Sequence, residues 1–265
     1  NKPQRYWKQC ESICTSSIDA INSVLESYNV PRLKSFEDIF VGDITLIPSF
    51  PEFDILRKTD NDNDNTYYIG PILWEGVLDK SVKENVGYNA DEHVFCYIGQ
   101  CLDEISETSE NILKSIHNIA YEFNIEFIIS IENKHTAEHI SSKYADENIH
   151  ICNWLPIEQA YSNSKFIVCH GGHGSCMGLF QYKVPALIIP THTEREYNAR
   201  LVEAVGAGIS IPYDDITERK MEQAMRRLLL DSKYKDNTVH FNQVINSRYH
   251  DGVALAAKYI LSLCS

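Results

Sequence analysis

The chain has 265 residues, of which 43% are hydrophobic and 23% charged, a balance typical of a globular protein that can bury a sizeable core. It carries 37 acidic residues against 24 Lys and Arg, and the net charge of −13 argues against a nucleic-acid partner and against anionic membranes. Apolar runs such as 186–189 are far shorter than the roughly 18 residues of a membrane span, so no transmembrane segment is expected.

Eight cysteines are spread along the chain without a Cys-x-x-Cys pair, and several lie inside apolar runs. This pattern favours reduced, buried thiols in a cytoplasmic protein. His135 and His139 stand four residues apart on a predicted helix, but no third metal ligand is near them in the sequence. We therefore expect no metal site and no other cofactor.

The first 69 residues are interpreted as one region. A helix is predicted over 16–28, where apolar residues recur on one helical face, and Pro31 ends it. A short strand is predicted over 44–47.

An alternation of Asp and Asn over 60–65 resembles the start of a calcium loop. However, Asn65 occupies the position of the glycine and Pro71 that of the bidentate acid in the EF-hand pattern. The segment is therefore predicted to be a solvated loop.

From about residue 93 onward, strand-like apolar runs alternate with helical stretches five times. This alternation predicts an α/β fold, a Rossmann-like parallel sheet of six strands with helices on both faces. The strands are predicted at 94–98, 126–131, 149–152, 166–169, 186–189 and 209–211. The helices are predicted at 109–123, 136–144, 157–162, 175–182, 194–205, 217–230 and 251–263. Because parallel sheets bind ligands at the carboxyl ends of their strands, the loops that follow the strands are the candidate site.

Two of these loops carry weaker signals. Gly99 and Gln100 follow the first strand, where a glycine allows close approach of a ligand, although an ordinary turn has the same composition. Trp154 follows the third strand, and its ring either offers a face to a base or sugar or packs in the core.

The strongest signal is the segment His170-Gly171-Gly172-His173-Gly174-Ser175, between a strand and a predicted helix. Glycines at a helix N-terminus expose backbone N–H groups, and the helix dipole adds positive potential. His170 and Ser175 can add further donors. The segment is neither a P-loop, nor the dinucleotide motif, nor a nucleophile elbow. We interpret it as a phosphate site.

Glu194 opens the helix after the fifth strand. An acid there suits the helix dipole, and it can also accept hydrogen bonds from sugar hydroxyls. Arg195 beside it can pair with Glu194 or Glu196, or reach an anionic group.

In this order the loops resemble the donor-binding half of the GT-B glycosyltransferases of family 1, the UDP-glycosyltransferase and macrolide glycosyltransferase group. The resemblance rests on Trp154-Leu155-Pro156, the segment 170–175, Val184-Pro185, the segment 190–199 and Gly206-Ala207-Gly208. The segments 42–46, 51–54 and 68–71 resemble the end of the family's N-terminal domain. The resemblance implies that the chain has three parts. Residues 1–69 would be the end of an N-terminal acceptor domain, and 70–250 would form the donor domain. Residues 251–265 would form a helix that packs back toward the first domain.

The resemblance implies an inverting, metal-independent enzyme that transfers a sugar from a UDP or TDP donor to a hydroxyl of a small-molecule or lipid-like acceptor. Trp154 would stack on the base, and the backbone of Leu155 would bind its edge. Glu194, with Arg195 beside it, would bind the sugar. The diphosphate would be held by Gly99, Gln100, His170, Gly172, Gly174 and Ser175.

Three positions depart from the family pattern. Ile157 replaces a Gln and Gly178 replaces a Glu that contact the ribose in many members, which weakens the choice between uridine and thymidine donors. Arg195 replaces the usual Gln and suggests an unusual sugar or an anionic group near it.

The family's catalytic base is a His in the early N-terminal domain, which has no counterpart in this sequence. The chain is therefore expected to bind a donor but to transfer poorly, and its apolar faces within 1–69 and 251–263 are expected to favour self-association. Two alternatives stay open: a nucleotide-sugar 2-epimerase or hydrolase of the same architecture, and a non-catalytic subunit that supplies a nucleotide-sugar site to a partner.

Overall fold

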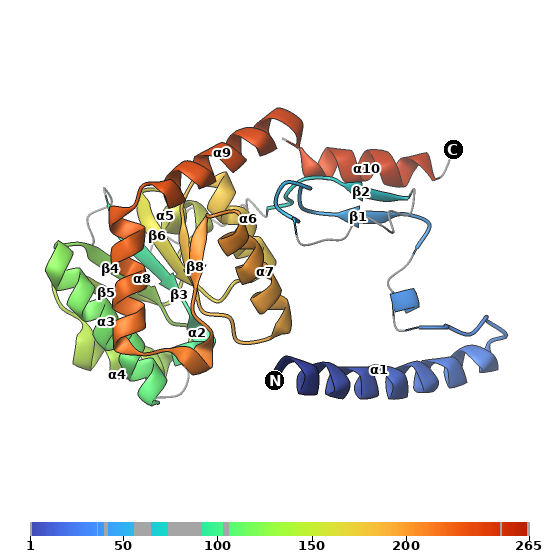
Figure 1. Ribbon diagram of the computed structural model, residues 1–265, viewed down its shortest axis with the longest axis horizontal. Helices are drawn as coiled ribbons and strands as arrows, with labels where there is room; N and C mark the ends of the chain where they lie inside the picture. The colour runs from blue at the N-terminus through green and yellow to red at the C-terminus, as the bar shows by residue number, and fades with distance from the viewer. Residues whose placement is uncertain are drawn as a thin grey trace.

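The computed structural model describes residues 2–35, 37–39, 42–55, 65–73, 92–102, 106–249 and 251–263. Its main body is a six-stranded sheet between two layers of helices (Figure 1). The strands are β3 (His93–Tyr97), β4 (Glu126–Ser130), β5 (Ile149–Cys152), β6 (Ser164–Cys169), β7 (Ala186–Ile188) and β8 (Gly208–Ser210). All neighbouring strands are parallel. The predicted α/β fold is therefore confirmed, with each strand close to its predicted bounds.

The order of the strands in the sheet is β5-β4-β3-β6-β7-β8. The chain runs from β3 outward through β4 to β5, and then returns to the other side of β3 to form β6. The direction of winding therefore changes between β3 and β6. In open parallel sheets a ligand crevice lies at such a switch point, outside the carboxyl ends of the strands.

The helices divide between two hydrophobic clusters, one on each face of the sheet. One face is covered by α3 (Glu107–Phe123), α4 (Lys134–Tyr144) and α8 (Glu218–Leu230). The other is covered by α5 (Ile157–Tyr161), α6 (His173–Gln181), α7 (Thr193–Ala204) and α9 (Lys233–Arg248). A short helix, α2 (Gly99–Leu102), follows β3. Neither α2 nor α9 was predicted.

Burial on both faces explains why the strands are continuous apolar runs. On β3, Val94 and Cys96 join one cluster and Phe95 joins the other. Five cysteines are buried thiols, as predicted: Cys96, Cys101, Cys152, Cys169 and Cys176. Burial raises the pKa of Cys169 to about 11. None of the described helices has the length and hydropathy needed to cross a bilayer.

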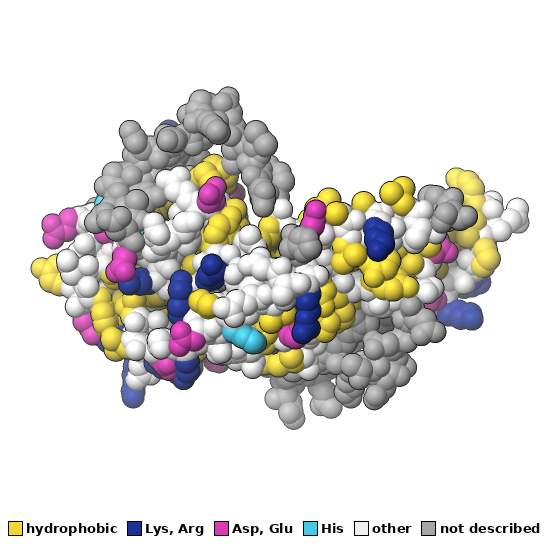
Figure 2. Space-filling model, turned by 90° about the horizontal axis from the view of Figure 1, so that it is seen from above, with side chains coloured by type: hydrophobic (Ala, Val, Ile, Leu, Met, Phe, Trp, Pro, Cys, Tyr) yellow, Lys and Arg dark blue, Asp and Glu magenta, His cyan; other side chains and the backbone are white. Residues whose placement is uncertain are grey.

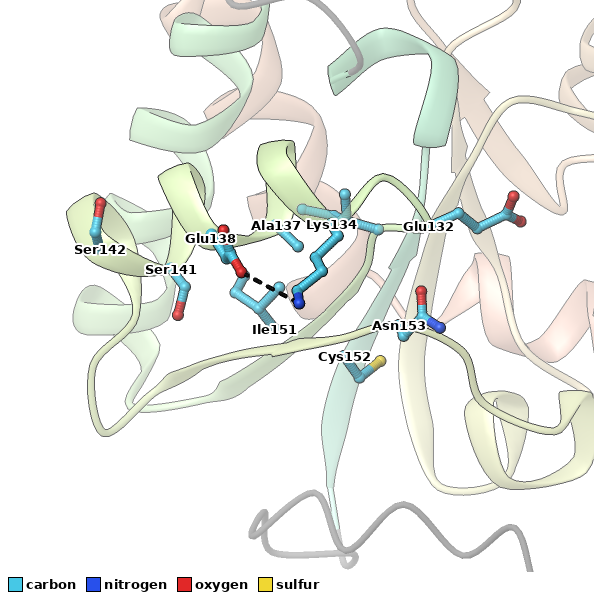
Figure 3. Close-up of a pocket in the computed structure, with 10 residues that line it drawn as sticks. Glu132, Lys134, Ala137, Glu138, Ser141, Ser142, Ile151, Cys152 and Asn153 are labelled. Atoms are coloured by element: carbon cyan, nitrogen blue, oxygen red, sulfur yellow. Dashed lines mark ion pairs between the residues drawn. The ribbon is translucent and has the colours of Figure 1, made fainter.

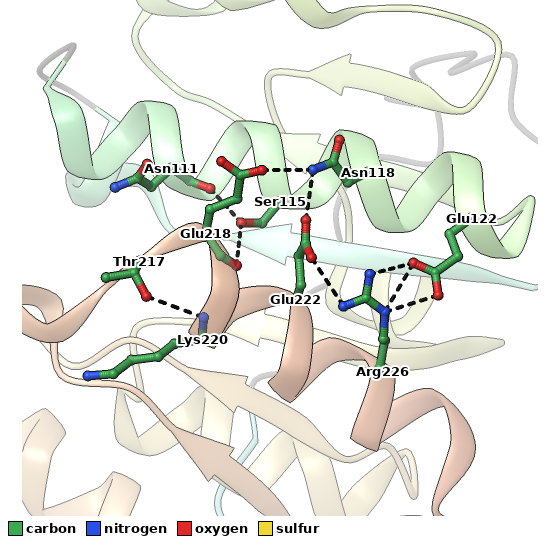
Figure 4. A network of polar contacts seen from close by, with 9 residues as sticks. All are labelled: Asn111, Ser115, Asn118, Glu122, Thr217, Glu218, Lys220, Glu222 and Arg226. Atoms are coloured by element: carbon green, nitrogen blue, oxygen red, sulfur yellow. Dashed lines mark hydrogen bonds and ion pairs between the residues drawn. The ribbon is translucent and has the colours of Figure 1, made fainter.

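A polar network joins α3 to α8 along the rim of one cluster (Figure 4). The amide of Asn118 donates to Glu218 at 3.0 Å and to Glu222 at 2.7 Å. The guanidinium of Arg226 donates to both carboxylate oxygens of Glu122, with Nε–O distances of 3.0 Å, and also to Glu222. These bonds align the two helices at a place remote from the glycine-rich loop.

A second group of elements lies beside the main body (Figure 1). Strands β1 (Thr45–Ile47) and β2 (Thr66–Tyr68) form a parallel pair. Helix α10 (Gly252–Ser262) lies along them, with the ring of Tyr259 stacked on that of Tyr67 at 4.2 Å. Strand β1 and helix α10 were predicted, whereas β2 was not.

The N-terminal helix α1 (Lys2–Ser27) begins well before the predicted start at residue 16, and a single turn of 3-10 helix (Glu37–Ile39) follows it. Thr15, Ser16 and Ser17, which could cap a helix that starts at residue 16, lie instead within α1. Except for Asn65, the calcium-like segment lies outside the described residues. The proposed division into parts at 69 and 250 stays a prediction.

Candidate functional site

The glycine-rich loop lies between β6 and α6, at the switch point of the sheet. Gly171 has φ +85°, and a Cβ there would come within 2.8 Å of Ile188 Cγ2, so this position favours glycine on both counts. Gly172 is the N-cap of α6, and no side chain caps that end. The first N–H groups of a helix have no partner within it, so those of α6 can bind an anion.

The space in front of this helix start is open. A Cβ built on Gly174 meets nothing within 4 Å, whereas one built on Gly172 would lie 3.0 Å from His170 Nε2. Ser175 is half-buried one residue further on. A ligand can therefore approach the backbone at Gly174 closely, with the imidazole of His170 beside it.

His170 contacts the end of β3. Its ring is half-buried, lies 5.4 Å from the ring of Tyr97 and makes a hydrogen bond to the backbone of Tyr97. Burial lowers the pKa of His170 below its usual value, and the positive charge of Arg195 lowers it further. Gly99 and Gln100 begin α2 directly after β3, so their backbone lies at the neighbouring strand end.

Tyr97 is a polar residue of the site that the sequence interpretation missed. It ends β3, and its hydroxyl donates to Glu132 Oε1 at 3.3 Å. Burial raises the pKa of Tyr97, and so does the nearby carboxylate of Glu132. A hydroxyl-bearing residue at the carboxyl end of a buried strand was the only available signal.

Glu194 and Arg195 lie on the first turn of α7, next to the glycine-rich loop. Arg195 Nη1 donates to Thr191 Oγ1 at 2.7 Å. Glu194 is exposed, and its Oε1 accepts a hydrogen bond of 2.6 Å from Nδ2 of Asn198. The same Nδ2 donates to the carbonyl oxygen of Gly171 at 2.9 Å. Asn198, which we had not predicted as a site residue, therefore bridges α7 and the loop.

Trp154 and Leu155 come from the loop after β5, on the far side of β4 and β3 from His170. Trp154 is half-buried and Leu155 is buried. Ser130 Oγ donates to the carbonyl oxygen of Asn153 at 3.1 Å, which ties this loop to the end of β4. The predicted site residues thus do not form one cluster but a row along the carboxyl edge of the sheet.

A cavity of about 690 Å³ lies between α4 and the ends of β4 and β5, next to the loop of Trp154 (Figure 3). Its lining includes Glu132 and Asn153. Lys134 and Glu138 form an ion pair of 3.8 Å within it. The cavity therefore extends the row of site residues at its β5 end.

Ile157 and Gly178, two of the positions that depart from the family pattern, face each other across α5 and α6. A Cβ on Gly178 would lie 3.4 Å from Ile157 Cδ1 and 3.0 Å from Tyr161 Cε1. The two departures therefore form one apolar contact. Within the part of the chain that the structure describes, no three His, Cys, Asp or Glu side chains gather as a metal site.

Comparisons with known proteins agree with this architecture. A protein-family model described as erythromycin biosynthesis protein CIII-like, C-terminal domain, matches residues 114–250. UDP-glucuronosyltransferase 3A1 of Homo sapiens is 25% identical over 194 residues, covering 69% of this chain and 35% of that protein. Cyanidin-3-O-glucoside 2-O-glucuronosyltransferase of Bellis perennis is 31% identical over 171 residues, covering 58% and 36%. This chain thus spans little more than a third of these curated relatives.

Among solved structures, that of the glycosyltransferase VinC in complex with DTDP is similar to this one. The TM-score is 0.71 at 18% identity, over 92% of this chain and 57% of that chain. The structural likeness therefore extends well beyond the 114–250 match. Together, the parallel sheet, the glycine-rich loop and the family match show that the chain belongs to the erythromycin biosynthesis protein CIII-like C-terminal domain family and has the fold of the GT-B glycosyltransferases.

Proposed function

We propose that this chain binds a nucleoside diphosphate sugar and forms the donor half of an inverting, metal-independent glycosyltransferase. The observation that carries the proposal is the uncapped start of α6 at the switch point, with open space in front of Gly174. Its N–H groups and the helix dipole suit a diphosphate without the help of a cation. The relatives named above are transferases, and VinC was solved with DTDP, which supports transfer over epimerisation.

The row of site residues fits the elongated shape of such a donor. Trp154 and Leu155 at the end of β5 would bind the base, and Glu194 and Arg195 after β7 would bind the sugar. The diphosphate would lie between them, on Gly99, Gln100, His170, Gly172, Gly174 and Ser175. The order of the sheet separates β5 from β7 by four strand spacings of about 4.8 Å each, a span suited to a nucleotide sugar.

In the proposed reaction an acceptor hydroxyl attacks the anomeric carbon, and the bond from that carbon to the diphosphate oxygen breaks. The leaving diphosphate gains negative charge, which the N–H groups of α6 would stabilise, with the imidazole of His170 beside them. The acceptor would be a small or lipid-like molecule with a free hydroxyl. We assign no general base among the residues described.

A glycine substitution tests the proposal directly. Gly174→Ala adds one methyl group to open space, so the fold should be retained, and helix propensity should stabilise it by up to about 1 kcal/mol. The same methyl would occupy the approach of the diphosphate. In calorimetric titrations with UDP and with dTDP, in buffer containing EDTA, we expect the wild-type chain to bind and Gly174→Ala to bind at least tenfold more weakly.

The matched control is Gly42→Ala, a second glycine with ordinary backbone angles that lies in a different segment from the loop. It should bind like the wild-type chain. The proposal is refuted if the wild-type chain binds neither nucleotide. It is also refuted if Gly174→Ala and Gly42→Ala bind the nucleotides with equal affinity while both variants keep a normal melting temperature. Titrating both nucleotides also shows whether the chain prefers uridine or thymidine. The apolar contact between Ile157 and Gly178 offers no polar group that would favour either nucleoside.

We also propose that the chain self-associates through one end. In the described part of the chain, most of the large apolar side chains that are exposed belong to the segments before residue 73 and to α10 with the residue after it. They include Tyr28 at 75% and Leu261 at 67% exposure. Hydrophobic side chains gather at the end of the molecule formed by β1, β2 and α10 (Figure 2). A second copy of the chain would cover this apolar surface.

A further inference from the structure

Asn198 makes the best-defined polar bridge in the site. Its side chain lies on α7 with 6% of its surface exposed. The single amide nitrogen Nδ2 donates at 2.9 Å to Gly171 in the loop and at 2.6 Å to Glu194 one turn earlier on the same helix. A buried amide with both hydrogens engaged is held in one orientation, because breaking either bond would leave a polar group unpaired.

The bridge acts on the proposed sugar-binding acid. Because Oε1 of Glu194 accepts from Asn198, the orientation of the carboxylate is set, and Oε2 is left for a ligand hydroxyl. Without the bridge, an exposed glutamate would sample many rotamers, and ordering it on binding would cost conformational entropy.

The bridge also acts on the glycine-rich loop. Gly171 is in the left-handed region, and a Cβ on it would lie 3.2 Å from the carbonyl oxygen of Arg195, so this part of the loop packs directly on α7. The bond from Asn198 to the Gly171 carbonyl spans 27 residues of sequence. It holds the turn that leads into the first N–H groups of α6.

We propose that Asn198 is a positioning residue that couples the diphosphate-binding loop to the sugar-binding carboxylate, so that both halves of the donor meet a preorganised site. The inference rests on the proposed function. Asn198 touches neither part of the ligand itself; it acts through Gly171 and Glu194. Charged and titratable groups lie around the bridge: Glu194, Arg195, His192, His170, Cys169 and Cys176.

The diagnostic variant is Asn198→Asp, which keeps the shape and removes both donors. Near pH 8 its carboxylate would face that of Glu194 and the Gly171 carbonyl, and the repulsion should weaken binding of UDP-glucose at least tenfold. Two carboxylates this close take up a shared proton as the pH falls. The protonated acid can then donate again, so affinity relative to wild type should recover at least threefold by pH 5.5.

Two further variants separate positioning from folding. The control is Asn118→Asp on α3, because the amide of Asn118 also donates to two acceptors but lies away from the site. This variant should bind UDP-glucose like the wild-type chain at both pH values. Asn198→Ala also loses both bonds but cannot be protonated. It should bind weakly at both pH values, with UDP-glucose losing more affinity than UDP because Glu194 is no longer oriented.

The outcomes are distinguishable. If the wild-type chain binds neither UDP nor dTDP, the proposed function fails. If it binds UDP-glucose and Asn198→Asp binds equally well, the coupling role fails. The role also fails if Asn198→Asp is weak without recovery at low pH while its melting temperature falls, which marks a merely structural residue. Should Asn198→Asp not fold, the UDP against UDP-glucose comparison for Asn198→Ala decides the question.

Discussion

A permanent positive charge stands beside the proposed diphosphate site. The guanidinium of Arg195 is half-buried, is held by the Thr191 hydroxyl at 2.7 Å, and lowers the pKa of His170. The same charge lowers the pKa of Tyr97, against the larger effect of burial, which raises it. Its field therefore extends from α7 across the end of β6 toward β3. An arginine in this place suits an anionic part of the ligand, either a charged sugar or the diphosphate itself.

Arg195→Gln tests this charge. A hydrogen bond to a charged group contributes about 1.5–3 kcal/mol, so the variant should bind its anionic partner roughly tenfold or more weakly. Calorimetric titration with UDP, UDP-glucose and UDP-glucuronate locates the partner. A loss confined to UDP-glucuronate indicates a carboxylate-bearing sugar, whereas a loss shared by all three indicates the diphosphate. Unchanged affinity and donor preference would end the hypothesis.

At the scale of single residues, sequence patterns indicated Gly172, Gly174 and Glu194 but not Asn198 or Tyr97. Glycines before a helix and an acid on its first turn are local signals. Asn198 lies in the segment 190–199 that carries the family resemblance, but its role appears only where its amide meets Gly171 and Glu194 together, and the partner in the loop is 27 residues away. An isolated Asn in a helix has no distinctive pattern around it.

Helix α3 has a complete capping box at its start. Ser106 accepts from the N–H of Ser109 at 3.2 Å, and Ser109 Oγ accepts from the N–H of Ser106 at 2.7 Å. Asn124 ends the helix in the left-handed conformation. These caps set the limits of a helix that packs extensively on α8, so they contribute to the layer behind the site.

Ser106→Ala should therefore lower the free energy of unfolding by about 1 kcal/mol, the usual value of an N-cap serine. Denaturant titration followed by circular dichroism measures it. The matched control is Ser232→Ala, because the hydroxyl of Ser232, the N-cap of α9, makes no capping bond but only an exposed bond of 3.1 Å to Asp236. Equal losses for the two variants would show that the capping bond of Ser106 contributes nothing.

Helix α9 shows why one element could not be predicted. Its buried positions are Tyr234, Thr238, Asn242 and Ile245, spaced as in a helix but half of them polar. Asn242 is buried because its amide donates to the carbonyl oxygen of Gln181 at the end of α6. A search for apolar periodicity misses a face whose burial depends on such a tertiary hydrogen bond.

At the scale of the whole molecule, the apolar end is joined to the main body through aromatic side chains. Phe50 and Phe53 are buried, with their ring centroids 5.6 and 5.1 Å from that of Phe180 on α6. His173 Nε2 lies 3.0 Å from the carbonyl oxygen of Pro48. The segment that leaves β1 is therefore anchored at both ends of α6, while apolar side chains of α1 and α10 stay exposed.

Sedimentation velocity over a range of concentrations tests the proposed self-association. We expect the wild-type chain to associate as its concentration rises, and Leu261→Ser on α10 to weaken this association. Leu230→Ser on α8 is the matched control, because the two leucines are 67% and 73% exposed but lie on different parts of the molecule. A wild-type chain that stays monomeric at high concentration would contradict the proposal.

The sequence by itself determined the alternation of strands and helices in the main body, apart from α2 and α9, and the place of the glycine-rich loop, because periodicity, caps and turns are encoded within a few neighbouring residues. Only the tertiary structure decided the order of the strands, which brings the end of β3 beside that of β6. It also decided the Asn198 bridge and the contact between Ile157 and Gly178. These features join residues that are distant along the chain, and their geometry depends on how whole elements pack rather than on any local pattern.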